Sequence, residues 1–402
     1  MLGPSESSSS RLQAPDLIRG LALGGILLVN VWAFALPTAA GMNPTVYGDL
    51  TGWNRLAWIG TEVLARGKFL AQFSLLFGAG LLLFSDRATE RGQNPVSLHV
   101  KRMVVLGVIG LLHAYLLWEG DVLVTYSLCG TFVFLFRNHS SRQLLGLAAL
   151  FFLLLLVFQG IQALQFAGGD TTLQLVQRQA WNPTPDALGA EILTRRSGGT
   201  ALWAWRAQEA FRRQTQSFVS DHFWRISGLM FLGAGLFRSG MLGDRVPGRR
   251  IRVLVLGAGT TGMVLTLLAV FLEERSRWDL GTHLFPAGPL QDLGSVGLAL
   301  GYLGILLWWV QRPRQSLLKT AMGAMGRLAL TIYLLQSLCF GLLFRPVGLG
   351  LFGKLDRLTL FLLALFLWIL FLAGALWYER TVGQGPVEQI WRTLYRGRSK
   401  RG

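Results

Sequence analysis

The stretch RMVVLGVIGLLHAYLLWEGDVLVTY, residues Arg102 to Tyr126, decides the fold class of this chain. It is an apolar segment of helical length that carries a histidine, His113, and ends in a short turn with Glu119 and Asp121. A titratable side chain in a hydrocarbon-length segment is costly unless a partner or water meets it. The stretch therefore predicts a membrane-spanning helix and marks His113 as a candidate functional residue.

The composition extends this prediction to the whole chain. Of 402 residues, 52% are hydrophobic and only 15% are charged, which excludes an ordinary soluble globular domain. A formal charge of +17 would suggest nucleic acid as the partner of a soluble protein, but basic residues in a membrane protein first follow the positive-inside rule. We therefore expect an all-α polytopic membrane protein that has the lipid bilayer as a partner and no nucleic acid.

Ten apolar runs are long enough to be predicted as transmembrane helices. They cover 17–36, 68–84, 103–118, 121–136, 143–166, 219–237, 253–272, 290–310, 321–344 and 358–378. If both termini lie inside, the inside segments hold 21 Lys and Arg residues, against 6 in the short outside loops. This bias predicts that both the N-terminus and the C-terminus are cytoplasmic.

The runs divide the chain into three predicted parts. These are an N-terminal five-span half (1–166), a long extracytoplasmic loop (167–217) and a C-terminal five-span half with a basic cytoplasmic tail (218–402). Within the loop, tryptophan and arginine side chains such as Trp203 and Arg206 recur at helical spacing. The loop is therefore either an amphipathic helix on the outer headgroups or a lid over an acceptor site.

On this topology, ionisable residues from separate segments reach one depth near the outer surface. A rise of about 1.5 Å per residue puts His113 in the outer half of the membrane. The second run begins at this surface, and the sixth run starts from it. We expect an outward-facing chamber at this depth, formed by Glu62, Lys68, His113, Glu119, Asp121, Asp221, His222 and Arg225.

His113 is the candidate catalytic residue of this chamber. An imidazole beside a carboxylate is held in one tautomer and acts as a general base near neutral pH. Either Asp121 or Glu119 is the candidate partner, although Glu119 lies about 240° around a straight helix from His113, so the turn has to fold back. The alternative is a structural histidine that is hydrogen-bonded to a neighbouring helix.

Three further residues are candidates for substrate binding, namely Lys68, His222 and Arg225. Each also has a simpler interpretation. Lys68 is long enough to extend to the outer headgroups. Asp221, near His222 and Arg225, is a residue type that the helix dipole favours at a solvated helix start.

Basic residues also gather on the predicted inside face. Arg102 closes one such cluster, and Arg327 begins the ninth run. Clusters of this kind suit phosphates or anionic lipid headgroups, and topology alone also predicts them. No HExxH or CxxC spacing is present, so we expect no metal site.

Five motifs taken together resemble the YeiB-like bacterial membrane proteins. They are RLQAPDLIRGLALGGILLVN (11–30), FLAQFSLLFGAG (69–80), WEGDVLVTY (118–126), GRLALTIYLLQS (326–337) and GPVEQIWR (385–392). The sequence departs from that family at Ile332, where an asparagine is expected between the threonine and the tyrosine.

This resemblance implies a ten-span fold related to transmembrane acyltransferases, a superfamily that includes the lysosomal heparan-alpha-glucosaminide N-acetyltransferase. Members of that superfamily carry D-x-x-R-G near the inner end of the first span, as do Asp16, Arg19 and Gly20 here. The lysosomal enzyme has its catalytic histidine before its second span. Because the matching region, 58–69, has no histidine in this chain, His113 or His222 would take that role.

The leading prediction is an acyltransferase of the bacterial cytoplasmic membrane. It passes an acyl group from cytosolic acyl-CoA, with acetyl-CoA as the first choice, to an extracytoplasmic glycan or lipid. Arg102, Arg327 and Arg19 are the candidate ligands of the CoA phosphates. A small-metabolite transporter and a scaffold with a vestigial site are the alternatives. Small-residue faces at 78–80 and 233–235 suit packing within one protomer or between two, so a homodimer is among the expected assemblies.

Overall fold

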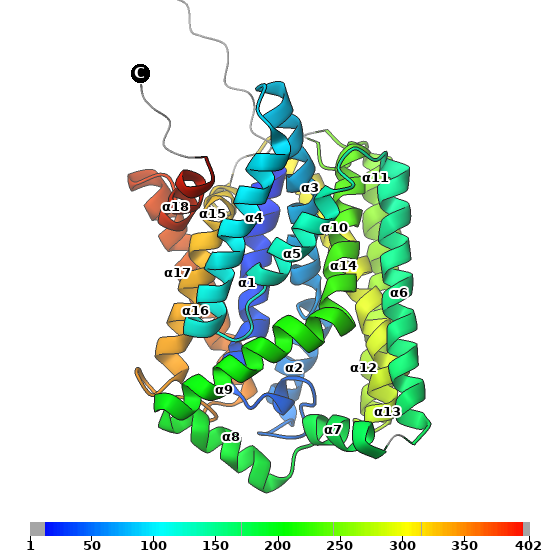
Figure 1. Ribbon diagram of the computed structural model, residues 1–402, viewed down its shortest axis with the longest axis vertical. Coiled ribbons are helices and arrows are strands. Elements are labelled where there is room, and N and C mark those ends of the chain that lie inside the picture. The colour runs from blue at the N-terminus through cyan, green and yellow to red at the C-terminus, as the bar shows by residue number, and fades with distance from the viewer. Residues whose placement is uncertain (1–12, 170, 244, 315, 397–402) are drawn as a thin grey trace, which may run out of the picture.

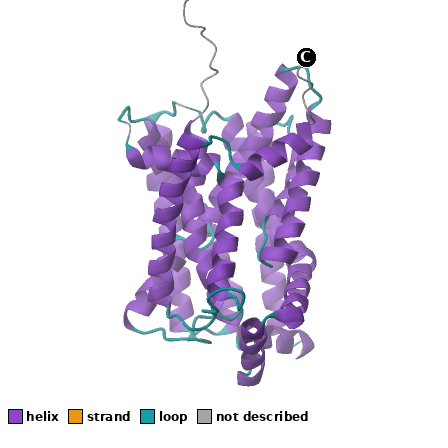
Figure 2. Cartoon of the chain, turned by 90° about the vertical axis from the view of Figure 1, so that its left-hand side faces the viewer, coloured by secondary structure: helices purple, strands orange, loops and turns teal. Residues whose placement is uncertain are grey.

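The computed structural model describes residues 13–169, 171–243, 245–314 and 316–396. Every regular element in these residues is helical, and the long helices run side by side with the loops gathered at two ends (Figures 1 and 2). A helix satisfies its backbone hydrogen bonds within one segment, as hydrocarbon surroundings require. The prediction of an all-α protein with membrane-type helices is confirmed.

The elements labelled η are short turns of 3-10 helix (η1) or π-helix (all others). In chain order the elements are α1 (Gln13–Ala35), η1 (Ala39–Gly41), α2 (Gly52–Leu64), α3 (Lys68–Glu90), α4 (Pro95–Leu112), η2 (His113–Leu117), α5 (Leu123–Phe134), α6 (Ser141–Ala167), α7 (Thr171–Trp181), α8 (Pro185–Ser197), α9 (Gly199–Arg212), η3 (Arg213–His222), α10 (Phe223–Arg238), α11 (Gly248–Arg252), η4 (Val253–Gly259), α12 (Thr260–Arg275), α13 (Leu280–Thr282), η5 (His283–Ala287), α14 (Gly288–Val310), α15 (Leu317–Arg327), α16 (Ala329–Phe344), α17 (Arg357–Thr381) and α18 (Pro386–Arg396).

Seven helical stretches in the described part of the chain are long and apolar enough to cross a membrane, and a bent pair makes an eighth. The seven are Ala14–Ala35, Gly52–Glu90, Pro95–Leu117, Ser141–Ala167, Gly248–Arg275, Leu280–Val310 and Arg357–Thr381. All ten predicted runs are helical, but α5 and α10 are short, with 12 and 16 residues. The count of ten spans and the three-part division stay predictions.

The two ends of the bundle carry different elements. We call one the α18 end; α11, α15 and α18 lie there (Figure 1). The opposite end, which we call the α9 end, carries α7, α8 and α9 (Figure 1). Two elements from predicted inside segments, α11 and α18, therefore lie at one end, and the predicted outside loop lies at the other. Which end faces the cytoplasm stays a prediction.

Local sequence signals explain where the helices begin. The Asn94 side chain accepts hydrogen bonds from the backbone amides of Val96 and Ser97, so it caps α4, and Pro95 occupies the first helical position. At the start of α6, Ser140 and Gln143 form a reciprocal capping box. These caps satisfy amide groups that have no partner within the helix.

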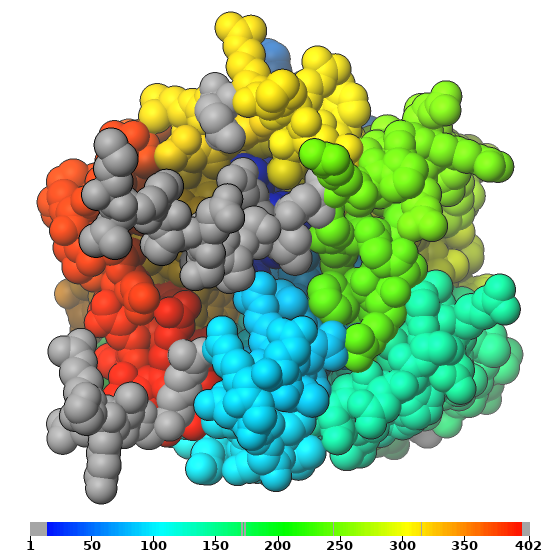
Figure 3. Space-filling view, turned by 90° about the horizontal axis from the view of Figure 1, so that it is seen from above, coloured from blue at the N-terminus to red at the C-terminus, as the bar shows by residue number. Residues whose placement is uncertain are grey.

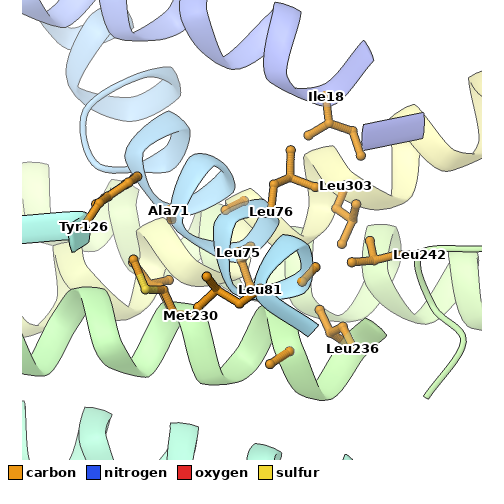
Figure 4. Packing of buried hydrophobic residues seen from close by; sticks show 14 of the residues in the cluster. Ile18, Ala71, Leu75, Leu76, Leu81, Tyr126, Met230, Leu236, Leu242 and Leu303 are labelled. Atoms are coloured by element: carbon orange, nitrogen blue, oxygen red, sulfur yellow. The ribbon is translucent and has the colours of Figure 1, made fainter. Parts of the chain in front are cut away.

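Small residues bring α3 and α10 into backbone contact. A Cβ added at Gly78 would lie 2.0 Å from the Met230 carbonyl oxygen, and one at Gly233 would lie 1.8 Å from the Leu75 carbonyl oxygen. Leu75 and Met230 are buried at this crossing (Figure 4). The two small-residue faces thus pack against each other within one protomer. A homodimer stays a prediction that these faces do not support.

The predicted run 321–344 is divided at Leu328, where α15 and α16 meet at 85°. The break exposes backbone amides at the start of α16, and the Glu388 carboxylate of α18 accepts hydrogen bonds from the amides of Leu330 and Thr331 at 2.8 and 3.1 Å. A carboxylate also complements the positive end of the α16 dipole. Ile332, the departure from the family pattern, is 5% exposed in the apolar core.

Candidate active site

The backbone after α4 folds back at His113. The helix widens into the π-turn η2, and Trp118 is extended, with φ −160° and ψ 124°. The Trp118 amide donates to the His113 carbonyl at 2.8 Å and closes the turn. Wide turns of this kind within helices occur frequently at functional sites. The turn returns the following residues to the side chain of His113.

Asp121 is the carboxylate that meets the imidazole. Its Oδ1 lies 2.9 Å from His113 Nδ1, and both side chains are 1% exposed. Its Oδ2 accepts a hydrogen bond from the backbone amide of Val124 at 2.8 Å, near the start of α5. A carboxylate fixed in this way orients the ring and stabilises the imidazolium form. The predicted histidine–carboxylate pair therefore has the geometry of a general base.

A serine meets the other ring nitrogen. Ser337 Oγ, on α16, lies 2.9 Å from His113 Nε2. The ring of Tyr333, one turn earlier on α16, lies 5.0 Å from the imidazole centroid. Sequence reasoning assigned no role to either residue, although both belong to the GRLALTIYLLQS motif.

Glu119 has a different environment from Asp121 and does not pair with His113. Its carboxylate oxygens lie 3.7 Å from Arg195 of α8 and 3.9 Å from Arg206 of α9. The prediction that Glu119 is a candidate partner of His113 is therefore wrong. The reason is geometric, since the turn directs Glu119 toward the arginines of α8 and α9 and Asp121 toward His113.

Two arginines attach the α9 end to the helix that carries the histidine. Arg206 donates to the Leu116 carbonyl at 3.0 Å, and Arg345 donates to the Leu117 carbonyl. These carbonyls lie at the C-terminal end of the helical segment, where cations are favourable. Burial lowers the pKa of Arg345 to about 10, and the neighbouring Arg206 also lowers it. The predicted outside loop is therefore built into the site through α8 and α9.

A cavity of about 560 Å³ lies on the α9 side of Asp121. Its ionisable lining residues are Glu62, Arg66, Asp121, Arg213, Asp221, His222, Arg225, Glu273, His283 and Asp292. Three tryptophans, Trp58, Trp118 and Trp278, also line it. The structure thus brings together the predicted residues His222, Arg225 and Asp121.

Arg225 is fixed by carboxylates from two helices. Its guanidinium lies 2.6 Å from Asp221 Oδ1 and 2.7 Å from Asp292 Oδ2 of α14. Lys68 has a different position from the predicted one. It is 0% exposed, is absent from the cavity wall, and donates to the Glu62 carbonyl at 2.8 Å. Its predicted substrate contact and its alternative in the headgroups are both corrected, because the amine is enclosed by the α2–α3 turn.

A second cavity of about 510 Å³ lies at the α18 end. Six arginines and two acids line it: Arg19, Arg87, Arg91, Arg102, Arg327, Arg392, Asp16 and Glu388. Seen from above, α18 in red and the α3–α4 turn in light blue lie on one side, with the blue of α1 deeper in the centre (Figure 3). The three arginines that the sequence predicted as phosphate ligands therefore share one cavity.

These three arginines have different contacts. The Arg102 guanidinium lies 4.9 Å from the Trp391 ring and 5.0 Å from the Phe84 ring. Arg327 forms an ion pair with Glu379 of α17, and Arg19 lies 3.4 Å from Asp16. Stacking on aromatic rings fixes the plane of a guanidinium while leaving its N–H groups for a ligand.

The two cavities share four lining residues: Ile26, Leu70, Val122 and Tyr333. We call these four side chains the septum. They come from α1, α3, the turn before α5, and α16. One septum residue, Val122, directly follows Asp121 in the chain, and another, Tyr333, packs against the imidazole of His113. Consequently, the His113–Asp121 pair lies beside the layer where the two cavities meet.

Comparisons with known proteins identify relatives along the whole chain. The family described as "Protein of unknown function (DUF418)" matches residues 236–398. The chain is 32% identical over 382 residues, 94% of either chain, to "Uncharacterized protein YeiB" of Escherichia coli (strain K12). It is 25% identical over 399 residues to "Uncharacterized protein YxaH" of Bacillus subtilis (strain 168), which covers 96% of this chain and 94% of that one. No solved structure matches.

Proposed function

Given that this chain belongs to the YeiB-like protein family, we propose that it is a transmembrane acyltransferase, which passes an acyl group from acyl-CoA to an acceptor across the bacterial cytoplasmic membrane. The observation that carries this proposal is the meeting of two cavities at the septum, beside a buried histidine–carboxylate pair. Such a layout would let a donor and an acceptor approach one base from opposite sides of the septum.

The α18 end is the proposed donor side and faces the cytosol. Its cavity has six arginines and two acids, and guanidinium groups bind phosphate through paired N–H donors. Arg102, Arg327 and Arg19 would hold the phosphates of acyl-CoA, with acetyl-CoA as the simplest donor. The thioester would then point toward the septum.

The α9 end is the proposed acceptor side. Tryptophans and ionisable side chains, among them His222 and Arg225, line its cavity and suit a polar acceptor such as a glycan or a lipid headgroup. His113 would act as the base that takes the proton from the attacking nucleophile, and Asp121 would stabilise the imidazolium ion that forms. Glu119 would support this site from a distance by holding Arg195 and Arg206.

A transporter for a small metabolite is the second candidate function. Two cavities that a thin septum separates also suit alternating access, in which each cavity opens in turn. The two candidates differ in what stabilises the protein. An acyltransferase is stabilised by acyl-CoA, whereas a transporter is stabilised by its own solute, because only a ligand of the native state raises the melting temperature.

The test uses the purified full-length protein in lipid nanodiscs. We expect acetyl-CoA or a longer acyl-CoA to raise the melting temperature and to be turned over with release of free CoA thiol. His113→Ala should lower this turnover by about 10²- to 10⁴-fold, the usual contribution of a general base. His139→Ala is the matched control, since His139 follows α5 and lines neither cavity. The proposal fails if no acyl-CoA raises the melting temperature or is turned over.

A further inference from the structure

Ser337 completes a chain of three hydrogen-bonded groups. The chain runs from Asp121 Oδ1 to His113 Nδ1 at 2.9 Å, and from His113 Nε2 to Ser337 Oγ at 2.9 Å. The three residues come from the α4–α5 turn, η2 and α16, and all are buried. Nucleophile, base and orienting carboxylate in this order are the geometry that activates a serine in acyl transfer.

The direction of the two hydrogen bonds follows from the Asp121 carboxylate, which lies against His113 Nδ1. An ionised carboxylate only accepts, so Nδ1 carries the proton in the neutral imidazole, and Nε2 is then a bare acceptor. The Ser337 hydroxyl must therefore donate to Nε2. Its other acceptor is the Tyr333 carbonyl at 3.4 Å, a longer contact. The serine hydrogen thus points at the base that would remove it.

One residue of the septum, Tyr333, lies next to this serine. Neither Ser337 nor His113 lines the α9-end cavity or the α18-end cavity, but Tyr333, four residues before Ser337 on the same helix, lines both. The buried Tyr333 hydroxyl has no hydrogen-bond partner in the part of the chain that the structure describes, so a rotation of that ring breaks no side-chain hydrogen bond. A rotation of the Tyr333 side chain would open the serine to a thioester from the α18 end and to an acceptor from the α9 end.

We propose that Ser337 is the nucleophile of a two-step transfer that proceeds through an acyl-serine; this inference rests on the proposed acyltransferase function. In the first step, His113 takes the Ser337 proton, Oγ bonds to the thioester carbonyl carbon, and the C–S bond breaks. The imidazolium returns the proton to the leaving CoA thiolate. In the second step, an acceptor hydroxyl or amine loses its proton to His113 and bonds to the same carbon. The ester C–O bond breaks, and Ser337 regains the proton.

Two experiments on the full-length protein in nanodiscs test this mechanism. The first incubates the protein with [14C]acetyl-CoA without acceptor and maps the labelled peptide by mass spectrometry. The second treats the protein with a fluorophosphonate, which labels activated serines independently of acyl-CoA. Ser337→Ala is the test variant. Ser227→Ala is the matched control, because Ser227 is also buried, lies on α10 and lines neither cavity.

We expect one acetyl group per protein on Ser337 in the wild type and in Ser227→Ala, and none in Ser337→Ala. Ser337→Ala should also lower turnover by about 10³-fold or more, as in serine enzymes whose triad acts as a unit. Turnover of acetyl-CoA without a labelled Ser337 peptide would overturn the inference and leave the proposed function standing. Fluorophosphonate labelling of Ser337 in a protein that neither binds nor turns over acyl-CoA would support the nucleophile and reject the acyltransferase.

Discussion

The cavities at the two ends of the bundle are similar in volume, about 560 and 510 Å³, but differ in charge. The α9-end cavity has five carboxylates, three arginines and two histidines in its wall, and many of these are paired with one another. The α18-end cavity has six arginines and two carboxylates. A multiply charged anion such as CoA is therefore favoured at one end only. This comparison supports the proposed donor and acceptor sides by an argument that does not use the topology count.

The largest effect should come from Asp121, the carboxylate that orients His113 beside the septum. In Asp121→Asn, the amide no longer fixes the protonated Nδ1, and we expect turnover of acetyl-CoA to fall by about 10⁴-fold. Glu119→Gln should lower turnover far less, because Glu119 contacts Arg195 and Arg206 rather than His113. Steady-state assays of both variants check this order. Equal losses would mean that Asp121 is not the specific partner of the histidine.

The affinity of the α18-end cavity for acetyl-CoA should depend strongly on one arginine, Arg102. Arg102→Ala removes a guanidinium that stacks on Trp391, and loss of charge-assisted hydrogen bonds worth about 1.5–3 kcal/mol should raise the Kd of acetyl-CoA about 10- to 100-fold. Lys101→Ala removes the adjacent exposed charge and should change the Kd less than threefold. Titration calorimetry measures both. An unchanged Kd for Arg102→Ala would remove the charge argument for the donor side.

A substitution in the wall of the α9-end cavity should change the KM for the acceptor rather than the binding of acetyl-CoA. Arg225→Gln leaves Asp221 and Asp292 without their shared cation, so we expect a destabilisation of about 1–3 kcal/mol and a higher KM for the acceptor. The Kd of acetyl-CoA should stay within twofold. Arg238→Gln, on the same helix α10, breaks the exposed pair with Asp86 and should cost about 1 kcal/mol or less. A weaker affinity for acetyl-CoA in Arg225→Gln would contradict the separation of the two sites.

The smallest expected effect concerns Glu209, on α9, and its contribution to the stability of the fold at different pH values. Burial raises the pKa of Glu209, but hydrogen bonds and charge from Arg212 and Arg213 outweigh it, so the pKa lies below its usual value of 4.5. A lowered folded-state pKa stabilises the fold above the unfolded-state pKa, and this gain is lost as the pH falls through the folded-state value. The melting-temperature difference between wild type and Glu209→Gln should therefore shrink as the pH is lowered below about 4. Glu90→Gln, an exposed site at the α18 end, is the control.

The sequence predicted the helical class, because apolar run length follows from helix geometry. Five of the eight residues predicted at the depth of His113 line the α9-end cavity, and their depth in the membrane stays a prediction. It left Asp121 and Glu119 as equal partners for the histidine. The distinction depends on the π-turn η2 and the extended Trp118, and no periodicity signals either feature. Lys68 was misplaced for a similar reason, since the α2–α3 turn encloses its amine.

Ser337 illustrates what sequence reasoning could not reach. It lies 224 residues from His113 in the chain, and its contact depends on how α16 packs after the break at Leu328. That break, in turn, depends on Glu388 from α18, which satisfies the amides that the run 321–344 leaves without partners. The two cavities likewise depend on how the helices pack. The sequence could therefore indicate the charged residues in their walls, but not that the two cavities share the septum.

The septum also has an electrical consequence. If water and ions fill both cavities, most of the membrane potential would fall across the layer formed by Ile26, Leu70, Val122 and Tyr333. A unit charge that crosses a full drop of 100 mV changes in energy by about 2.3 kcal/mol. Because His113 and Asp121 lie beside this layer, a proton that reaches them from one side has traversed part of that drop. The membrane potential would thereby bias the protonation of the base, and the same four side chains would have to keep ions from passing between the cavities.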